Sequence, residues 1–220
     1  KLKLGMALPL VQQIVASTAD PHVQGAALRT LCALQEADAV EDIAPYLNSP
    51  EADIRQGSAV GLLRYGGVPG VLAAGEWLKE QEQSNHSADR CLIARVIGEV
   101  AIEQFYHPLV ALLSDPNPAI RRAALTAAGQ VKHRNLLPLV VNNLSDHSTR
   151  SAASEALVAY GHLMLPTVEE ALSDGKFSEE NTARLVRGCM SVKGDEVIKL
   201  MYRHIDHPSN GVRDQIFSVL

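Results

Sequence analysis

The sequence predicts an all-α fold in which about seven helical hairpins stack into a solenoid, an α-α superhelix. The first observation is a repeated phrase: residues 113–115 and 144–146 both read Leu-Ser-Asp, and each phrase is followed by arginine and paired alanines. A period of about 30 residues is typical of stacked units that are too small to bury their own apolar faces. The second observation is composition, 46% hydrophobic but only 4% aromatic, which favours close-packed helices over a sheet.

One anchor position recurs in every predicted unit. Each anchor follows a short polar turn that is rich in Asp, Asn, Ser and Pro. Oxygen atoms of such side chains can accept hydrogen bonds from the first free N–H groups of the next helix, and proline ends the previous helix. Each unit is therefore predicted to be a helix, a turn and a second helix. The anchors are Gln24, Arg55, Arg90, Arg121, Arg150, a position near Ala183, and Arg213.

The hairpins are predicted to form one domain over residues 1–220. Their boundaries are 1–36, 37–67, 68–102, 103–133, 134–162, 163–194 and 195–220. The third unit is the longest because residues 79–85 extend its first helix or its turn, and a solvated turn is the simpler interpretation. The chain starts without methionine and stops inside an amphipathic pattern, so we expect a domain from a longer polypeptide.

Apolar residues at spacings of three and four predict one-sided first helices, as at Val40, Ile43 and Leu47. Pro45 lies late in that helix and is expected to bend or shorten it. The second helices begin with small alanines and are expected to end eleven residues past the anchor, where glycine suits a left-handed stop. These ends are Gly66, Ala101, Lys132, Gly161 and Gly194.

With this register, the pattern Leu-x-Asp-x-x-x-x-Ile-Arg-x-x-Ala, from Leu113 to Ala124, resembles the HEAT repeat. It is most similar to the short bacterial variety that is also found in phycobilisome lyases. The resemblance implies a right-handed superhelix whose second helices line the concave surface, and it implies no particular activity. It also implies a ladder of turn aspartates and helix arginines, interrupted in units one and six. The ladder would pair Asp115 with Arg121, Asp146 with Arg150 and Asp206 with Arg213, and it would also include Arg55.

A second resemblance concerns the later units. Residues 165–169, 184–187 and 211–213 are similar to HEAT segments fused behind nucleotide-translocase-like transporters of bacteria. This resemblance implies a regulatory or linker domain of a larger membrane protein, and it would explain the abrupt ends of the chain.

The charge and the cysteine content indicate which kinds of partner and which cellular compartment to expect. The net charge is -5, with 8 basic against 13 acidic residues in positions 1–110 and 12 of each afterwards, so a nucleic-acid partner is not expected. Cys32, Cys91 and Cys189 are far apart, which indicates reduced thiols and a cytoplasmic setting. No apolar run is long enough to insert into a membrane, so the chain is expected to be cytoplasmic, alone or as the cytoplasmic part of a membrane protein.

Catalytic and metal-binding motifs are not evident in the sequence. His22, His86, His147 and His207 fall in the turns, where they are interpreted as polar turn residues. We expect no metal, no cofactor and no enzymatic activity. A HEAT-type enzyme, either a bilin lyase or a DNA glycosylase, is the alternative, and Cys91 is the thiol that a lyase would use.

The concave face is the candidate binding surface. Positions one, five and nine residues past each anchor are expected to be exposed on the second helices. Arg64, Arg95 and Arg122 among them would suit an acidic or phosphorylated segment, because guanidinium groups pair bidentately with carboxylate or phosphate. The sequence therefore predicts a non-catalytic scaffold that binds a protein, a peptide or another domain of its own full-length chain. The surface comprises Arg29, Gln56, Val60, Arg64, Arg95, Glu99, Arg122, Thr126, Gln130 and Glu155.

Overall fold

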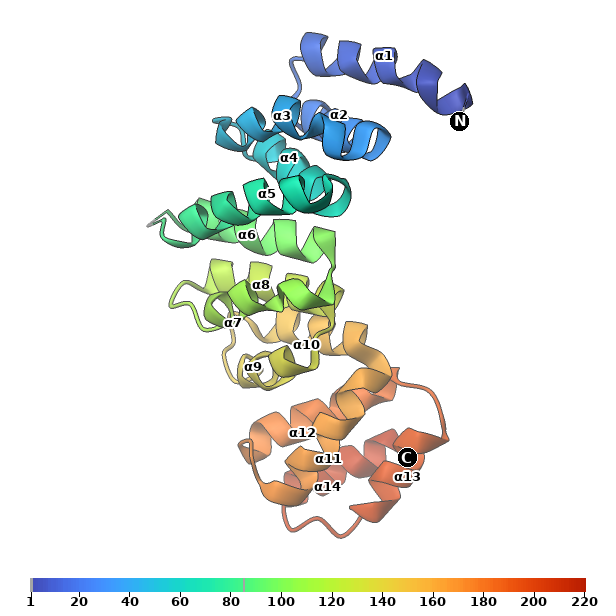
Figure 1. Ribbon diagram of the computed structural model, residues 1–220. Coiled ribbons are helices and arrows are strands. Elements are labelled where there is room, and N and C mark those ends of the chain that lie inside the picture. The colour runs from blue at the N-terminus through green and yellow to red at the C-terminus, as the bar shows by residue number, and fades with distance from the viewer. Residues whose placement is uncertain (1, 85) are drawn as a thin grey trace. The chain divides into compact units, whose positions relative to one another are not determined.

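The computed structural model describes residues 2–84 and 86–220, and these residues form α-helices, short 3-10 helices and connecting turns (Figure 1). The predicted all-α fold of repeated helical hairpins is confirmed. The predicted single domain appears as two compact units, residues 1–100 and 101–220, and each is described by itself. The division between them follows the third predicted hairpin.

The first unit stacks its hairpins so that the second helices form a continuous layer. Helix α4 packs between α2 and α6, while α5 covers α4 and α6 from the side of the first helices. The first helices are α1 (Leu2–Ser17), α3 (Val40–Ile43) with the 3-10 helix η2 (Ala44–Asn48), and α5 (Gly67–Glu82). The second helices are α2 (Pro21–Gln35), α4 (Ala52–Tyr65) and α6 (Ser87–Val100), with the 3-10 helix η1 (Glu36–Ala39) after α2.

The second unit repeats this arrangement. Its second helices again stack in order, with α10 between α8 and α12, and α14 next to α12 (Figure 1). The first helices are α7 (His107–Leu112), α9 (Leu137–Asn142), α11 (Leu165–Asp174) and α13 (Asp195–Arg203). The second helices are α8 (Pro118–Val131), α10 (Arg150–Tyr160), α12 (Glu179–Gly188) and α14 (Asn210–Val219). Short 3-10 helices join them: η3 (Glu103–Tyr106), η4 (Arg134–Leu136), η5 (Gly161–Met164) and η6 (Cys189–Ser191).

Helix starts follow the predicted capping only in part, because α4, α10 and α14 have no side-chain cap. Asp20 accepts hydrogen bonds from the backbone N–H groups of His22 and Val23, at 2.9 and 3.4 Å, and so caps α2. Asn117 caps α8 and Ser178 caps α12 in the same way. In the turn of the third hairpin, Asn85 lies outside the described residues, and α5 extends to Glu82, which accounts for most of the extra length. Pro45 shortens its helix as predicted, because α3 ends at Ile43 and continues as the 3-10 helix η2.

Helix ends follow the prediction only in part. Ala101, Lys132 and Gly161 have positive φ angles, of 51°, 58° and 56°, and Lys132 has the expected left-handed conformation, whereas the ψ angle of -129° places Gly161 outside it. Gly66 was also expected to have a positive φ angle but has a φ of -75°, and the residue with a positive φ is its neighbour Gly67. The stop at Gly194 was also wrong for α12, which ends at Gly188 because η6 follows it.

Apolar side chains between the helix layers form the core of each unit. In the first unit Leu28, Ile43, Leu62, Leu92, Ile93 and Ile97 are fully buried, and in the second Leu109, Leu113, Ile120, Leu125, Leu136 and Leu137 are. No helix among the described residues is long and apolar enough to cross a membrane.

Helices α2 and α4 approach each other through glycines. A Cβ atom on Gly57 would overlap the backbone of Gly25, and one on Gly61 would crowd the backbone of Arg29 and the side chain of Cys32. Only residues without a side chain allow two helix backbones to come this close. Helices α2 and α4 are therefore packed more tightly than ordinary side-chain contacts permit.

A candidate binding surface on the second helices

The anchor arginines hold the turns that precede them. Arg121 Nη1 donates to the backbone carbonyls of Asp115, at 2.7 Å, and Pro116, at 3.1 Å. Its Nη2 atom forms an ion pair with the carboxylate of Asp146, which lies in the turn of the following hairpin. One guanidinium group thus fixes its own turn and links it to the next one.

The same arrangement recurs at other anchors. Arg55 donates to the carbonyls of Ser49 and Pro50 and forms an ion pair with Asp89, at 3.3 Å, in the next hairpin. The expected pairing of Asp146 with Arg150 is wrong, because the carboxylate of Asp146 points back to Arg121. Two further anchors hold backbone carbonyls: Arg150 donates to Leu144 and Ser145, and Arg213 donates to His207 and Pro208. The expected pairing of Arg213 with Asp206 is also wrong, because Arg213 donates instead to the Asn210 side chain and Asp206 is exposed.

The sixth hairpin was expected to interrupt the ladder, and its register differs from the prediction. Thr182 is buried, and the buried residues Leu185 and Cys189 follow it at the spacing at which Ala153 and Leu157 follow Arg150. The anchor is therefore Thr182 rather than Ala183. Nevertheless Arg184 reaches the preceding turn and donates to the carbonyl of Leu144, at 3.0 Å.

Predicted surface residues of the first unit converge on one carboxylate. Arg29 on α2 forms an ion pair with Glu99 on α6, and Gln56 Nε2 on α4 donates to the other oxygen of Glu99, at 2.8 Å. Arg64 Nη2 donates to the main-chain carbonyl of Glu99. Arg29 spans the width of α4 to do so, which the close packing of α2 on α4 allows. The structure therefore joins four of the predicted residues into a polar network across three second helices.

The other predicted residues of the first unit differ in exposure. Arg95 is exposed, and Cys91 is partly exposed. Val60 was expected on the exposed face but is fully buried. The reason is that α4 is enclosed between α2 and α6, so its fifth position past the anchor is covered.

Predicted surface residues of the second unit are exposed and do not converge. Arg122 donates to the carbonyl of Ser148, at 3.2 Å, and Thr126 donates to the carbonyl of Arg122, also at 3.2 Å. Glu155 accepts a hydrogen bond from Ser151, at 3.1 Å, and Gln130 is exposed.

A groove of about 340 Å³ lies between α10 and α12. Its apolar part includes Leu157, Val158 and Met190, and the last two side chains are 52% and 60% exposed. Three arginines contribute to the lining, and no aspartate or glutamate does. The remaining lining residues are Arg150, Ser154, Arg184, Arg187, Gly188 and Ser191.

Sequence reasoning missed this groove although the signal was present. When Thr182 is taken as the anchor, Arg187 lies five residues past it and Ser191 nine, which are positions of the predicted exposed rows. Val158 and Met190 are then equivalent, each eight residues past its anchor. The weak sixth repeat concealed these residues, since no arginine marks its anchor.

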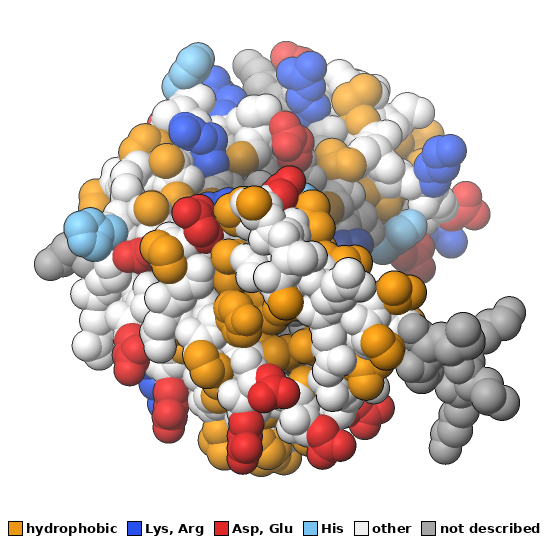
Figure 2. All heavy atoms as spheres, turned by 90° about the horizontal axis from the view of Figure 1, so that it is seen from above, with side chains coloured by type: hydrophobic (Ala, Val, Ile, Leu, Met, Phe, Trp, Pro, Cys, Tyr) orange, Lys and Arg blue, Asp and Glu red, His pale blue; other side chains and the backbone are white. Residues whose placement is uncertain are grey.

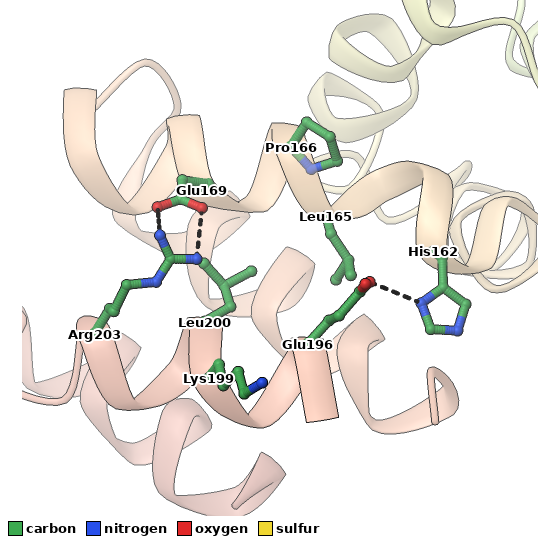
Figure 3. Close-up of a pocket in the computed structure, with 8 residues that line it drawn as sticks. All are labelled: His162, Leu165, Pro166, Glu169, Glu196, Lys199, Leu200 and Arg203. Atoms are coloured by element: carbon green, nitrogen blue, oxygen red, sulfur yellow. Dashed lines mark hydrogen bonds and ion pairs between the residues drawn. The ribbon is translucent and has the colours of Figure 1, made fainter. Parts of the chain in front are cut away.

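A second cavity, of about 590 Å³, lies between the first helices α11 and α13 (Figure 3). Arg203 holds Glu169 through two hydrogen bonds of 2.7 and 2.9 Å, and His162 lies 3.9 Å from Glu196. Figure 3 shows Leu165 and Leu200 between these two pairs. Since the lining contains two acidic residues, Glu169 and Glu196, and two basic residues, Lys199 and Arg203, the cavity has little net charge with which to select a ligand. Lys199 and Pro166 complete its lining.

Charge is divided between the helix layers of the first unit. Most exposed acids lie on its first helices and the 3-10 helix before α3, namely Glu36, Asp38, Glu41, Asp42, Glu76 and Glu80, and the exposed arginines Arg64 and Arg95 lie on its second helices. Asp53 on α4 and Lys79 on α5 are exposed exceptions. Figure 2 looks onto the end of the molecule that carries the N-terminus and shows acidic side chains along the lower edge of the view, with few Lys or Arg near them.

The three thiols form no disulfide and differ in environment. Burial raises the pKa of Cys32 to about 11 and that of Cys189 to about 12, because a thiolate is poorly solvated in an apolar core. Cys91, the thiol considered for a lyase, is partly exposed on α6.

Comparison with known proteins places these features in a family. The family profile described as HEAT repeats matches residues 75–161 and 106–186, which together span half of the chain. No curated protein matches the sequence. Similar solved structures include an engineered protein with 15% identity and a TM-score of 0.43, each chain being covered to 97%. Human deoxyhypusine hydroxylase in complex with glycerol is 15% identical with a TM-score of 0.39, covering 99% of this chain and 96% of that chain.

A designed armadillo repeat protein is also similar in structure, with 15% identity, a TM-score of 0.35, and coverage of 97% of this chain and 98% of that chain. The family match, the paired helices and the repeated turn arginines agree with one another. The chain belongs to the HEAT repeat family.

Proposed function

We propose that this protein is a non-catalytic scaffold that binds another protein along its second helices. HEAT repeats are typically protein-interaction scaffolds, and the match to that family supports a binding role. The observation that carries the proposal is the groove between α10 and α12, because Val158 and Met190 expose apolar surface there beside three arginines. Exposed apolar surface with a polar rim is typical of a protein-interaction site.

The second helices of the first unit support the same role in a different way. Arg29, Gln56 and Arg64 are held by Glu99, so this part of the surface is already ordered before a partner arrives. An ordered surface loses little side-chain entropy on binding. Arg95, which is exposed beside this network, would extend the contact.

The proposal can be tested with a photo-reactive amino acid placed at Val158 and, as a matched control, at Val110. Both are exposed valines of the second unit, but Val158 is on the second helix α10 and Val110 is on the first helix α7. After irradiation in cells, we expect a discrete adduct from position 158 only, identified by mass spectrometry. An adduct within the same polypeptide would identify another domain of the full-length chain as the partner. The same adducts from both positions would contradict the proposal.

A further inference from the structure

The groove between α10 and α12 is small. Its volume of about 340 Å³ lies near the lower end of the range of roughly 300–1,000 Å³ for ligand pockets. It can hold one or two side chains of an exposed segment, but it cannot hold a helix pair or a domain. The occupant must therefore be a short part of the partner.

The apolar side of the groove favours an apolar side chain. Leu157 is buried in its lining, and Val158 and Met190 are exposed there, from equivalent positions of consecutive repeats. Covering these exposed side chains removes apolar surface from water, which is the main favourable contribution to such contacts. Methionine also adapts to ligands of different shape.

The charged side of the groove favours an anion. The lining contains three arginines and no acidic residue, and two of these arginines are already occupied within the protein. Arg184 forms an ion pair with Glu180 at 2.5 Å, and Arg150 donates to the carbonyls of Leu144 and Ser145. Arg187 is exposed and pairs with no carboxylate among the described residues. One guanidinium group is thus available to a ligand.

A single available guanidinium suits a carboxylate better than a phosphate. Phosphorylated segments are usually bound by clusters of arginines, because the phosphate carries nearly two negative charges. A carboxylate carries one charge, and its two oxygen atoms match the guanidinium fork.

We infer that the groove between α10 and α12 binds a short exposed segment in which an apolar side chain is next to an aspartate or a glutamate. The apolar side chain enters between Val158 and Met190, and the carboxylate pairs with Arg187. This inference rests on the proposed function and adds the chemistry of the partner's segment to it.

The test is selection of a random peptide library, displayed on phage, against the intact protein. The strongest peptides are then synthesised with a fluorescent label, and their affinities are measured by anisotropy for wild type, Arg187→Glu, Met190→Asp and the control Arg134→Glu. Arg134 is an exposed arginine of the same unit that lies on η4, outside this groove. Thermal unfolding of each variant verifies that these surface changes leave the fold intact.

We expect the selected peptides to share an apolar residue beside Asp or Glu, and Arg187→Glu to weaken their binding about tenfold or more. Met190→Asp should weaken binding as well, Arg134→Glu should not, and added salt should weaken binding to wild type. Failure to enrich any peptide, enrichment of peptides without acidic residues, or equal binding to Arg187→Glu would overturn the inference.

A further variant separates the inference from the proposed function. Arg122→Glu changes the second-helix layer outside the groove. Peptides that lose affinity in Arg122→Glu but not in Arg187→Glu would support binding on the second helices and overturn the inferred groove. Peptides that no second-helix variant affects would count against both.

Discussion

Arg121 in α8 forms an ion pair with Asp146, which lies 25 residues further along the chain in the turn before α10. The same guanidinium group holds the carbonyls of Asp115 and Pro116 in its own turn. The aspartate in this turn therefore pairs with the arginine of the preceding repeat and not with the arginine of its own repeat. This ion pair helps to fix the position of one hairpin relative to the next, in addition to the contacts of the apolar core.

The first prediction concerns the pH dependence of this link. Hydrogen bonds from the side chain and backbone of Ser148, together with the charge of Arg121, hold the pKa of Asp146 below its usual value. A lowered pKa in the folded state stabilises the protein above the unfolded pKa of about 3.9, and this contribution is lost as the pH falls through the lower folded pKa. Asp146→Asn should lower the urea midpoint at neutral pH, and the difference from wild type should shrink in acid.

Asp214→Asn serves as the control, since Asp214 is an exposed aspartate of α14 whose side chain makes no ion pair among the described residues. It should change the midpoint little at either pH. A loss of stability in Asp146→Asn that is equally large in acid would show that the charge of Asp146 is not what stabilises the turn.

The second prediction concerns the network around Glu99. Its side chain and that of Arg29 are 26% and 33% exposed, so their attraction is only partly screened by water. Arg29→Gln, Glu99→Gln and the double variant form a cycle in which the coupling free energy should be about 1 kcal/mol. Urea unfolding at low and high salt would measure it, and the coupling should decrease with salt. A coupling free energy of zero at low salt would show that the Arg29–Glu99 pair does not stabilise the fold.

Much of the fold could be predicted because each repeat contains the same local signals. The spacing of Arg121 and Arg150, the prolines and the capping residues determine where each helix begins, and these signals are local in sequence. The ladder was predicted less well, because whether Asp146 joins Arg121 or Arg150 depends on how two hairpins are offset, which the sequence of one repeat does not contain.

The sequence predicted a set of positions of the second helices for the candidate surface, but not which of their side chains contact one another. The convergence of Arg29 on Glu99 depends on the close approach of α2 and α4, a tertiary feature that no single residue reveals. The groove at Arg187 was missed for a different reason. Thr182 occupies the place of an anchor arginine, so the register of the sixth hairpin was misplaced by one residue.

The third prediction concerns the glycine contact that brings α2 and α4 together. Gly57→Ala should destabilise the first unit by about 1–3 kcal/mol, because its Cβ would overlap the Gly25 backbone, which cannot move without shifting a helix. Gly75→Ala is the matched control, since a Cβ at Gly75 in α5 meets nothing within 4 Å. That control should stabilise the protein by about 0.5–1 kcal/mol, because alanine favours helix more than glycine does. Thermal unfolding would compare the two, and equal effects would contradict the close packing.

The fourth prediction concerns thiol reactivity. The pKa values of Cys32 and Cys189 are raised by burial to about 11 and about 12, so few thiolates are present at mildly alkaline pH, and reagents cannot reach either side chain. Cys91 is partly exposed and should react first with iodoacetamide. Mass spectrometry of tryptic peptides after a short reaction should find the label at Cys91, and at the other two cysteines only after denaturation. Rapid labelling of Cys189 in the native protein would contradict the burial of Cys189 at the start of η6.

The fifth prediction compares two helix ends with the same backbone conformation. Glu36 after α2 has φ 54° and ψ -128°, and Gly161 after α10 has φ 56° and ψ -129°. This region favours glycine, because the Cβ of any other residue crowds the adjacent backbone, at a cost of about 1–3 kcal/mol. Glu36 carries that cost in the first unit, while Gly161 avoids it in the second.

Glu36→Gly should therefore stabilise the first unit by about 1 kcal/mol, since relief of strain outweighs the added entropy of glycine in the unfolded chain. Removal of the exposed Glu36 side chain should cost little stability, and in the variant the backbone N–H of residue 36 can still donate to the carbonyl of Cys32. Gly161→Ala should destabilise the second unit by a similar or larger amount. Urea unfolding followed by fluorescence of Trp77, which is buried in the first unit, would isolate the effect of Glu36→Gly. A lower midpoint in that variant would mean that contacts of the Glu36 side chain outweigh the backbone strain.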